Sequence, residues 1–366
     1  MSERPILIMA GGTGGHVFPG LAVAERLREL GEHVIWLGTA RGLEAKLVPE
    51  AGFEFHTLPV AGLRGKGLVN WLFAPLRLGV ALWAALAFLL RVKPRAVLGL
   101  GGFASGPGGL MAAALSIPLV IHEQNAVAGL TNRWLAKVAD KVLEAFPGTF
   151  PEKVGAVHTG NPVRARISGL IEPELRFLGR EGPLRVLVLG GSLGALALNR
   201  TVPEALARLP EQGRPLVRHQ AGERTLDQAR AAYASAGVKP ELMPFIKDMA
   251  EAYGWADLVV CRAGALTVAE LAAAGLGAIL VPYPHAVDDH QSANGRYLTE
   301  AGAAVMIPES ELDARRLATE LKSIDRARAL EMAEAARRRA LPDATETVAR
   351  ICLGQARTGK ARGGAK

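Results

Sequence analysis

The sequence has little cysteine, few aromatic residues and no recognisable leader. Only Cys261 and Cys352 occur in 366 residues, without a Cys-x-x-Cys spacing, which argues against a disulfide framework or a cysteine zinc site and favours a reducing compartment. Aromatic residues make up 5% of the chain and nowhere interleave with Arg or Lys, so we expect no nucleic-acid binding despite a net charge of +8. The N-terminus lacks the basic and apolar regions of a secretory signal. These features predict a cytosolic protein.

Acidic residues are absent from one long window, Phe55 to His122. Its most apolar part, Leu78–Leu90, would rise only ~20 Å as a helix, less than the ~30 Å hydrocarbon core, so we expect no transmembrane helix. Aromatic residues and cations there favour a helix pair that dips into one leaflet of anionic lipid, with two buried crossover helices as the alternative. The residues concerned are Trp71, Phe73, Trp83 and Phe88 with Arg64, Lys66, Arg77, Arg91, Lys93 and Arg95.

Strand-like and helix-like segments alternate along the chain, beginning with Ile6–Met9 and a helix from about Leu21 to Leu30. Strands that are apolar throughout, such as VLVLG, indicate parallel sheets covered on both faces. Each half begins with a strand that ends in Gly-Gly and a small residue. We therefore expect an α/β fold with two Rossmann-like domains facing across a cleft. The expected parts are a first domain at 1–161, a second at 162–341, a helix at 342–356 that packs back on the first, and a disordered basic tail at 357–366.

The first glycine-rich segment, Gly11–Gly15, joins a strand to a helix N-terminus. Backbone N–H groups and the positive end of a helix dipole would converge there, which suits an anion. The segment lacks the third glycine of a nicotinamide fingerprint, and the chain contains no P-loop and no GxSxG nucleophile elbow. His122-Glu123 lacks the second histidine of HExxH, and the cluster Asp288-Asp289-His290 lacks a further ligand. We therefore expect neither a metal nor another cofactor.

After these exclusions, the glycine-rich segments are best explained as phosphate-binding loops that use backbone and hydroxyl groups. The motifs that contain them are those of one family. In one order, from the first strand to about residue 305, the chain contains GGTGGHVFPG, GLRGKG, LGLGGFASGPGG, HEQNAVAGLTNRWLA, AFPGTF, GNPVR, GGSLGA, VVCRAGALTVAELAAAG and VPYPHAVDDHQSANG. The chain resembles the MurG family, which transfers N-acetylglucosamine from UDP-N-acetylglucosamine to undecaprenyl-pyrophosphoryl-N-acetylmuramoyl-pentapeptide. The resemblance implies the GT-B arrangement, with the acceptor lipid on the first domain and the nucleotide sugar mainly on the second.

The resemblance assigns donor-binding roles mainly to the second half. Ser192, in GGSLGA, would hold the diphosphate, with an ordinary N-cap as the alternative. Glu270 would accept hydrogen bonds from the ribose, although an acid early in a helix is favourable in itself. The backbone of Ile246 would pair with uracil, and Arg164 would neutralise charge on the leaving group. The other expected donor-binding residues are Ala265, Leu266, Thr267, Val268 and Ala269 at a helix start, His290 and Gln291 on the sugar, and Thr13, Gly14, Gly15 and Asn125 in the first half.

Two glycine loops would hold the pyrophosphate of the acceptor. One is again Thr13–Gly15, and the other contains Gly101, Gly102, Phe103 and Ser105; Phe103 replaces a tyrosine common in the family, so a hydroxyl contact is lost. Asn132 would position an acceptor sugar. His16 is the candidate base for the sugar 4-hydroxyl, because imidazole titrates near neutral pH; a hydrogen-bonded loop histidine is the plainer interpretation. Glu123 is a rival base or the orienting partner of His16.

The expected reaction is an inverting displacement that releases UDP and forms the disaccharide lipid of peptidoglycan synthesis. We expect a peripheral protein on the cytoplasmic side of the inner membrane, with UDP-N-acetylglucosamine, the undecaprenyl-linked acceptor and an anionic membrane surface as partners. Three alternatives stay open: a GT-B glycosyltransferase with a diacylglycerol acceptor, a UDP-N-acetylglucosamine epimerase, and a nucleotide-sugar-binding scaffold without catalysis.

Overall fold

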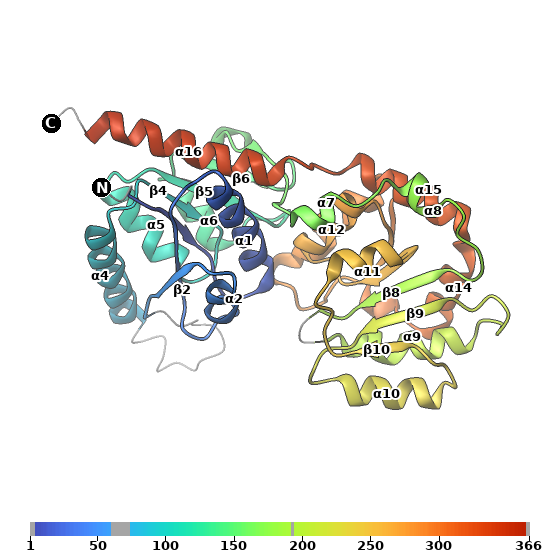
Figure 1. The fold of residues 1–366 in the computed structure, drawn as a ribbon. Helices are drawn as coiled ribbons and strands as arrows, with labels where there is room; N and C mark the ends of the chain where they lie inside the picture. Colours follow the sequence, from blue (N-terminus) through green and yellow to red (C-terminus); the bar gives the residue numbers. More distant parts are fainter. Residues whose placement is uncertain (1–3, 60–73, 192–193, 364–366) are drawn as a thin grey trace. The chain divides into compact units, whose positions relative to one another are not determined.

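The computed structural model describes residues 4–59, 74–191 and 194–363. The chain divides into two compact units (Figure 1). Unit 1 comprises residues 1–164 and 341–366, and unit 2 comprises residues 165–340. Each unit is built around one sheet whose neighbouring strands all run parallel.

The sheet of unit 1 has the strand order β3-β2-β1-β4-β5-β6-β7. Its strands are β1 (Ile6–Met9), β2 (Val34–Gly38), β3 (Glu54–Thr57), β4 (Ala96–Gly99), β5 (Leu119–Glu123), β6 (Lys141–Glu144) and β7 (Val157–His158). Its described α-helices are α1 (Gly14–Glu29), α2 (Glu44–Glu50), α4 (Ala74–Val92), α5 (Ser105–Ala114), α6 (Leu130–Leu135) and α16 (Ala344–Gly363). Ile6 and Ile8 pack on one face of the sheet with α1 and α16, whereas Leu7 and Met9 pack on the other with α4 and α5. Because both faces are covered, the central strands are apolar throughout.

The sheet of unit 2 has the strand order β10-β9-β8-β11-β12-β13. Its strands are β8 (Arg185–Leu189), β9 (Leu216–Gln220), β10 (Glu241–Met243), β11 (Leu258–Cys261), β12 (Gly277–Leu280) and β13 (Ala304–Met306). Its described α-helices are α7 (Ala165–Ser168), α8 (Pro173–Phe177), α9 (Leu196–Ala207), α10 (Leu226–Ser235), α11 (Met249–Trp255), α12 (Ala265–Ala274), α13 (His290–Thr299), α14 (Ala314–Ser323) and α15 (Arg326–Arg338). Val186 and Val188 of β8 share one core cluster with α9, α14 and α15.

Each sheet has a switch point at which the strand order reverses. The neighbours there are β1 and β4 in unit 1, and β8 and β11 in unit 2. Ligands of doubly wound folds bind beyond the carboxyl ends of such strand pairs. Glycine-rich segments follow all four of these strands, at residues 11–15, 101–102, 190–194 and 264. The predicted α/β fold with two Rossmann-like domains is confirmed.

The helix α1 begins earlier than the sequence pattern predicts. The pattern indicates a helix from about Leu21, but α1 starts at Gly14 and contains Pro19. Glycine and proline are poor helix formers, so local propensity hides the first turns. The buried side chains of Val17 and Leu21, which belong to the core of unit 1, hold these turns in place. His16 therefore lies in the first turn of a helix and not in a loop.

The helix α16 packs on unit 1, beside α1 (Figure 1). Val348, Ala349 and Cys352 are buried in the same core cluster as β1. A break that contains Pro342 separates α16 from α15. The helix continues to Gly363, so the tail that we expected to be disordered from residue 357 is helical up to that residue, as the Ala, Arg and Lys content allows.

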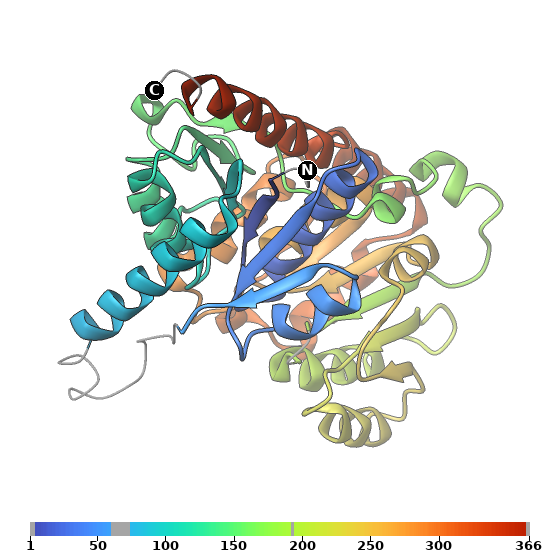
Figure 2. The same cartoon turned by 60° about the vertical axis from the view of Figure 1, so that its left-hand side comes forward.

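The predicted lipid-contacting segment includes α4, which is longer than the uncharged stretch suggests. Its 19 residues correspond to ~28 Å of helix, and Pro75–Val92 is long and apolar enough to cross a membrane by length and composition alone. The length argument against a span is therefore wrong, because the helix runs beyond Leu78 and Leu90 at both ends. However, α4 precedes β4 in the chain and lies beside the sheet of unit 1 (Figure 2). Its Ala85 and Leu89 are buried in the core cluster that contains Leu7 and Met9, as expected of a crossover helix. The first helix of the predicted pair, with Arg64, Lys66, Trp71 and Phe73, lies outside the described residues.

Candidate functional site

His16 lies at the switch point of unit 1, between the two glycine loops. Gly101 and Gly102 have φ angles of 99° and 83°, which glycine adopts without strain. A Cβ atom on Gly101 would lie 3.0 Å from Cε1 of His16, and a Cβ atom on Gly102 would clash with the backbone of Gly11. The two loops therefore pack directly against each other and against the imidazole ring, which only glycine at these positions permits.

The hydrogen-bond partner of His16 is Gln124, a residue that the sequence analysis did not single out. Nδ1 of His16 lies 2.6 Å from Oε1 of Gln124. Nε2 of Gln124 lies 3.0 Å from Nδ1 of His122 and 2.9 Å from the carbonyl oxygen of His122. Nε2 of His122 lies 2.9 Å from the carbonyl oxygen of Gly160. A continuous polar chain thus connects His16 to the buried end of β5, and the contact spans more than a hundred residues of sequence, so no local pattern predicts it.

His122 is fully buried, and burial lowers its pKa to about 4. The imidazole is therefore neutral near pH 7, with one nitrogen that donates and one that accepts.

Glu123 organises the loop after β5. Its side chain is 2% exposed. Oε1 accepts hydrogen bonds from the backbone N–H and the side-chain amide of Asn125, and Oε2 accepts from Gly129 N–H and from Nδ2 of Asn132. These bonds keep the loop that carries Asn125 and Asn132 in one shape. The bond to the ring of His16, which we considered for Glu123, is made by Gln124 instead.

A second buried carboxylate, missed by the sequence analysis, supports the first glycine loop. Glu44 of α2 is fully buried. Its Oε2 accepts from Gly12 N–H at 2.9 Å, and its Oε1 accepts from the N–H and hydroxyl of Thr39. The charge-assisted hydrogen bond from Gly12 N–H holds the first glycine loop against α2. The sequence signal for it is weak, because an acid at the start of a helix is common.

The remaining acceptor-loop residues differ in exposure. Thr13 and Phe103 are exposed, and Gly14 and Gly15 form the first turn of α1. Ser105 is fully buried, and its hydroxyl lies within hydrogen-bond distance of the carbonyl oxygens of Met9 and Gly101. Its side chain therefore shapes the second loop from inside and is turned away from the surface.

Arg164 is the last residue of the first of the two stretches that form unit 1. Its guanidinium carbon lies 5.1 Å from the centre of the Phe18 ring, which belongs to α1. Just before it, Asn161 donates to the carbonyl oxygen of Gln124 at 3.0 Å. The GNPVR motif is thereby tied to the same switch point as His16.

The switch point of unit 2 carries most of the predicted donor-binding residues. The helix α12 begins at Ala265 after Gly264, which has no side chain to cap it. Leu266, Thr267 and Ala269 are half-buried, and Val268 is buried. Glu270 is 4% exposed, and its Oε2 accepts from the hydroxyl of Tyr253 at 3.0 Å. Tyr253, on α11, orients this carboxylate and was not predicted from the sequence.

The other predicted donor-binding residues surround this helix start. Ile246 is buried, and its backbone N–H donates to Oε1 of Gln220 at 3.0 Å. His290 is the first residue of α13 and is half-buried. Oε1 of Gln291 accepts from Tyr283 N–H. Ser192 lies outside the described residues, between Gly191 and Gly194, whose φ angles are 77° and 81°.

Asp288 and Asp289, which the sequence analysis weighed as metal ligands, have φ angles of 53° and 48°. In the part of the chain that the structure describes, no three His, Cys, Asp or Glu side chains come together as a metal site would require.

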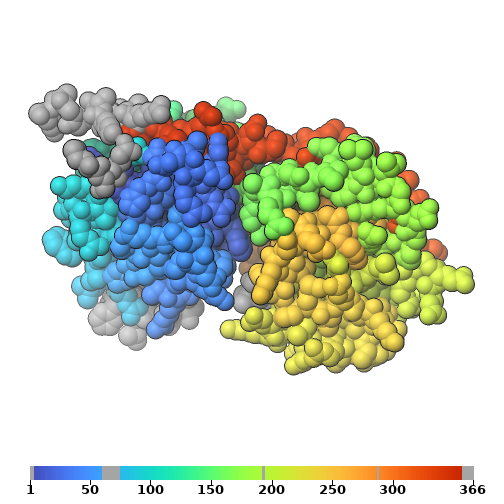
Figure 3. Space-filling model, viewed as in Figure 1, coloured from blue at the N-terminus to red at the C-terminus, as the bar shows by residue number. Residues whose placement is uncertain are grey.

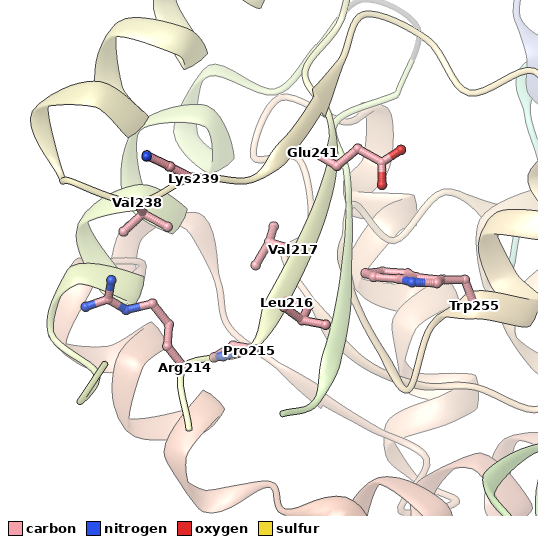
Figure 4. A pocket seen from close by; sticks show the side chains of 8 residues that line it. All are labelled: Arg214, Pro215, Leu216, Val217, Val238, Lys239, Glu241 and Trp255. Carbon is pink, nitrogen blue, oxygen red and sulfur yellow. The ribbon is translucent and has the colours of Figure 1, made fainter. Parts of the chain in front are cut away.

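A cavity of about 420 Å³ lies at the amino ends of strands of the unit 2 sheet, opposite the carboxyl ends that form the switch point. It is lined by Arg214, Pro215, Leu216, Val217, Val238, Lys239, Glu241 and Trp255 (Figure 4). All of them except Trp255, the last residue of α11, lie at or just before the amino ends of β9 and β10. None of the predicted site residues lines this cavity, so it is separate from the switch point.

Two family models match the chain. The glycosyltransferase family 28 N-terminal domain matches residues 6–144, and the glycosyltransferase family 28 C-terminal domain matches residues 185–348. The first match spans β1 to β6 of unit 1, and the second spans the whole sheet of unit 2 and ends in α16.

Curated relatives match over nearly the full length. The chain is 62% identical over 355 residues, covering 96% of this chain and 99% of the relative, to the UDP-N-acetylglucosamine--N-acetylmuramyl-(pentapeptide) pyrophosphoryl-undecaprenol N-acetylglucosamine transferase of Alkalilimnicola ehrlichii. It is 58% identical to the protein of the same name from Azoarcus, over 95% of this chain and 97% of that one. Among solved structures, the MurG of Acinetobacter baumannii matches with a TM-score of 0.83 and 40% identity, over 96% of this chain and 99% of that one. The chain is a glycosyltransferase that belongs to family 28 and, within it, to the MurG family.

Proposed function

We propose that this chain transfers N-acetylglucosamine from UDP-N-acetylglucosamine to the 4-hydroxyl of the muramoyl sugar of undecaprenyl-pyrophosphoryl-N-acetylmuramoyl-pentapeptide. The product is the disaccharide lipid of peptidoglycan synthesis. The observation that carries the proposal is the 62% identity to a relative named for this reaction, over 96% of the chain. The retention of an oriented histidine between two glycine loops supports it, because the reaction needs a base beside an anion site.

In this proposal, unit 1 binds the acceptor. The loops at Thr13–Gly15 and Gly101–Phe103 offer backbone N–H groups and the N-terminus of α1 to the acceptor pyrophosphate. Asn132 and Asn125, held by Glu123, are near the sugars. The 4-hydroxyl oxygen attacks the anomeric carbon while His16 takes its proton, so that the bond from this carbon to the diphosphate breaks and UDP leaves with inversion. The burial and the hydrogen bonds of Glu123 favour a role in shaping the loop and disfavour a role as base.

Unit 2 binds the donor in this proposal. The first turn of α12, with Ala265, Leu266 and Thr267, faces the diphosphate, and Ser192 of the GGSLGA motif binds it as well. Glu270, oriented by Tyr253, accepts from the ribose. Ile246, whose N–H donates to Gln220, pairs with uracil through its backbone carbonyl oxygen, and His290 and Gln291 bind sugar hydroxyls. On unit 1, the residues proposed to bind the donor are Arg164, Thr13, Gly14, Gly15 and Asn125, and no metal takes part in the proposed reaction.

The finer part of the proposal is peripheral contact with an anionic membrane surface on the cytoplasmic side. The outer face of α4 exposes Leu76, Val80, Trp83 and Leu90, and Trp83 is 72% exposed. The exposed cations Arg77 and Arg91 flank them. The helix lies at the surface of unit 1 (Figure 3). An apolar face with cations and an inner face packed on a sheet fits a helix that lies in the headgroup region of one leaflet.

The test is product formation from radiolabelled UDP-N-acetylglucosamine. A short-chain analogue of the undecaprenyl-linked acceptor should become labelled, whereas diacylglycerol should not. Release of UDP should require the acceptor. Labelling of diacylglycerol, or conversion of the nucleotide sugar to an epimer without an acceptor, would favour one of the two alternative enzymes. Binding of the nucleotide sugar without any turnover would favour the scaffold.

A further inference from the structure

The orientation of the Gln124 side-chain amide follows from one contact. One polar atom of this amide lies 2.9 Å from the carbonyl oxygen of His122. A carbonyl oxygen only accepts hydrogen bonds, so the atom that faces it must be the NH₂ nitrogen. The other polar atom, Oε1, therefore faces His16. This assignment does not depend on telling nitrogen from oxygen by their positions, which structures do poorly.

The state of His122 agrees with this orientation. Nε2 of His122 faces the carbonyl oxygen of Gly160 at 2.9 Å, so Nε2 carries a proton. In the neutral ring, Nδ1 then holds a lone pair, which accepts the second hydrogen of the Gln124 amide at 3.0 Å. Both hydrogens of the amide and both nitrogens of the His122 ring are satisfied. The group that faces His16 is thus held from behind by a buried, fully bonded pair.

The state of His16 follows in turn. Its Nδ1 lies 2.6 Å from Oε1 of Gln124, and an amide oxygen only accepts, so Nδ1 of His16 must carry a proton. In the neutral ring the lone pair is then on Nε2. The hydrogen bond made by one ring nitrogen of a histidine determines the protonation of the other. In His16, the bond from Nδ1 to Gln124 leaves Nε2 without a proton.

We propose that Gln124 is a positioning residue for the reaction: it fixes the tautomer and orientation of His16, so that Nε2 is the atom that takes the proton of the acceptor hydroxyl. This inference rests on the proposed function, because it gives His16 the role of base. It makes His122 the support that holds the Gln124 amide in its orientation. In catalytic triads, a carboxylate orients the histidine that acts as the base. Here the uncharged amide of Gln124 takes the place of that carboxylate.

The choice of an amide has a physical reason. Both proposed substrates carry a pyrophosphate, and the loops around His16 offer N–H groups to an anion. A carboxylate next to the ring would add a negative charge beside this anion and would repel it, whereas an amide oxygen orients the ring without a net charge.

The first test reads the tautomer directly by nitrogen NMR on the full chain labelled in its eight histidines. His16→Asn assigns the signal of His16. At a pH where the ring is neutral, the wild type should show a proton on Nδ1 and a bare Nε2, and Gln124→Met should lose this preference. A wild-type ring with its proton on Nε2 would overturn the proposal, and so would a Gln124→Met variant with an unchanged tautomer. This test requires no turnover, so it stands even if the proposed reaction fails.

The second test compares two replacements at one position. Both Gln124→Met and Gln124→Glu remove the NH₂ group that bonds His122, but only Glu keeps an oxygen that accepts from His16. We expect Gln124→Met to lower kcat about 10- to 100-fold, as is typical for residues that orient a functional histidine, with KM for UDP-N-acetylglucosamine nearly unchanged. Gln124→Glu should recover part of kcat, because it restores the acceptor for Nδ1 of His16, and should raise KM for the acceptor, because its charge repels the pyrophosphate.

Equal losses in the two variants, or a change confined to KM, would contradict the positioning role. Wild-type turnover with the lipid acceptor is the reference, so a failure of the proposed function appears as no turnover in any variant. A failure of the positioning role appears as undiminished turnover in Gln124→Met.

Discussion

At the residue scale, the proposed chemistry depends on His16. The first turn of α1 and the packing of Gly101 hold the ring in place. We predict that His16→Ala retains UDP binding, because the donor set lies mainly on unit 2, and loses turnover by a factor of about 10² to 10⁴, as is typical of a lost general base. Calorimetric titration with UDP and a steady-state assay measure the two effects. His33→Ala, at an exposed histidine that pairs with Glu54, is the matched control and should leave both unchanged. Unimpaired turnover in His16→Ala would remove it as the base.

The motif HEQN shows which part of the site could be predicted from the sequence: the segment that carries the partner of His16, but not the partner itself. The motif draws attention to Glu123, because a carboxylate is the usual partner of a catalytic histidine. The contact with His16 goes to the neighbouring Gln124, and the carboxylate turns toward Asn125, Gly129 and Asn132. Alternate residues of a strand point to opposite sides, but which side meets α1 depends on the sheet order. Tertiary contacts of this kind cannot be derived from spacing.

At the element scale, the N-termini of the helices at the switch points provide the positive charge that we propose to stabilise the pyrophosphates. The N-terminus of a helix is equivalent to about half a positive charge, and the start of α12 follows a glycine with no capping side chain. In the proposed function, this partial charge stabilises the departing diphosphate. We therefore predict full activity in excess chelator, measured by release of UDP with and without added magnesium. Activity that is lost in chelator and restored by magnesium would contradict this assignment of charge.

The element α4 makes a separate prediction about the membrane. Trp83 points away from the sheet, so Trp83→Glu should fold normally and should weaken binding to anionic vesicles about tenfold or more, given ~1.5–3 kcal/mol for burying a large apolar side chain. Co-sedimentation at low and high salt measures this, and binding of the wild type should fall at high salt because Arg77 and Arg91 contribute. Leu175→Glu, on α8 with a 65% exposed side chain, is the control and should bind as the wild type does. Equal binding of Trp83→Glu and the wild type would exclude α4 as the contact.

Element types were predictable from the sequence, but some bounds were not. Apolar strands and glycine-rich turns identified the parallel sheets. The start of α1 was missed because glycine and Pro19 disfavour helix locally, and the core contacts of Val17 override them. The length of α4 was underestimated because Arg77 and Arg91 were treated as its ends, although cations are common within exposed helix turns.

At the scale of the whole molecule, each unit contains one buried histidine that affects stability. Burial lowers the pKa of His122 in unit 1 to about 4 and that of His219 in unit 2 to about 3, below the ~6.5 of an unfolded chain. The unfolded state therefore binds more protons below pH 6.5, so the stability is fully present above pH 6.5 and is lost as the pH falls toward these values. We predict a loss of about 1.4 kcal/mol per pH unit from each histidine, measured by denaturant unfolding between pH 7.5 and 5.

The variant His219→Phe tests this dependence in unit 2. It should flatten the pH dependence of the unit 2 transition below pH 6.5, whereas His33→Ala, at the surface, should not. An unchanged slope in His219→Phe would show that other groups set the acid sensitivity.

The proposed function depends most on the two switch points, each of which we propose to hold a pyrophosphate with backbone N–H groups. A crystal structure of the chain with UDP bound tests this directly. We predict that the diphosphate lies within hydrogen-bond distance of the first turn of α12 and of Gly191 or Ser192, which follow β8 in the sequence, with the ribose on Glu270. A diphosphate bound away from both of these segments would contradict the account.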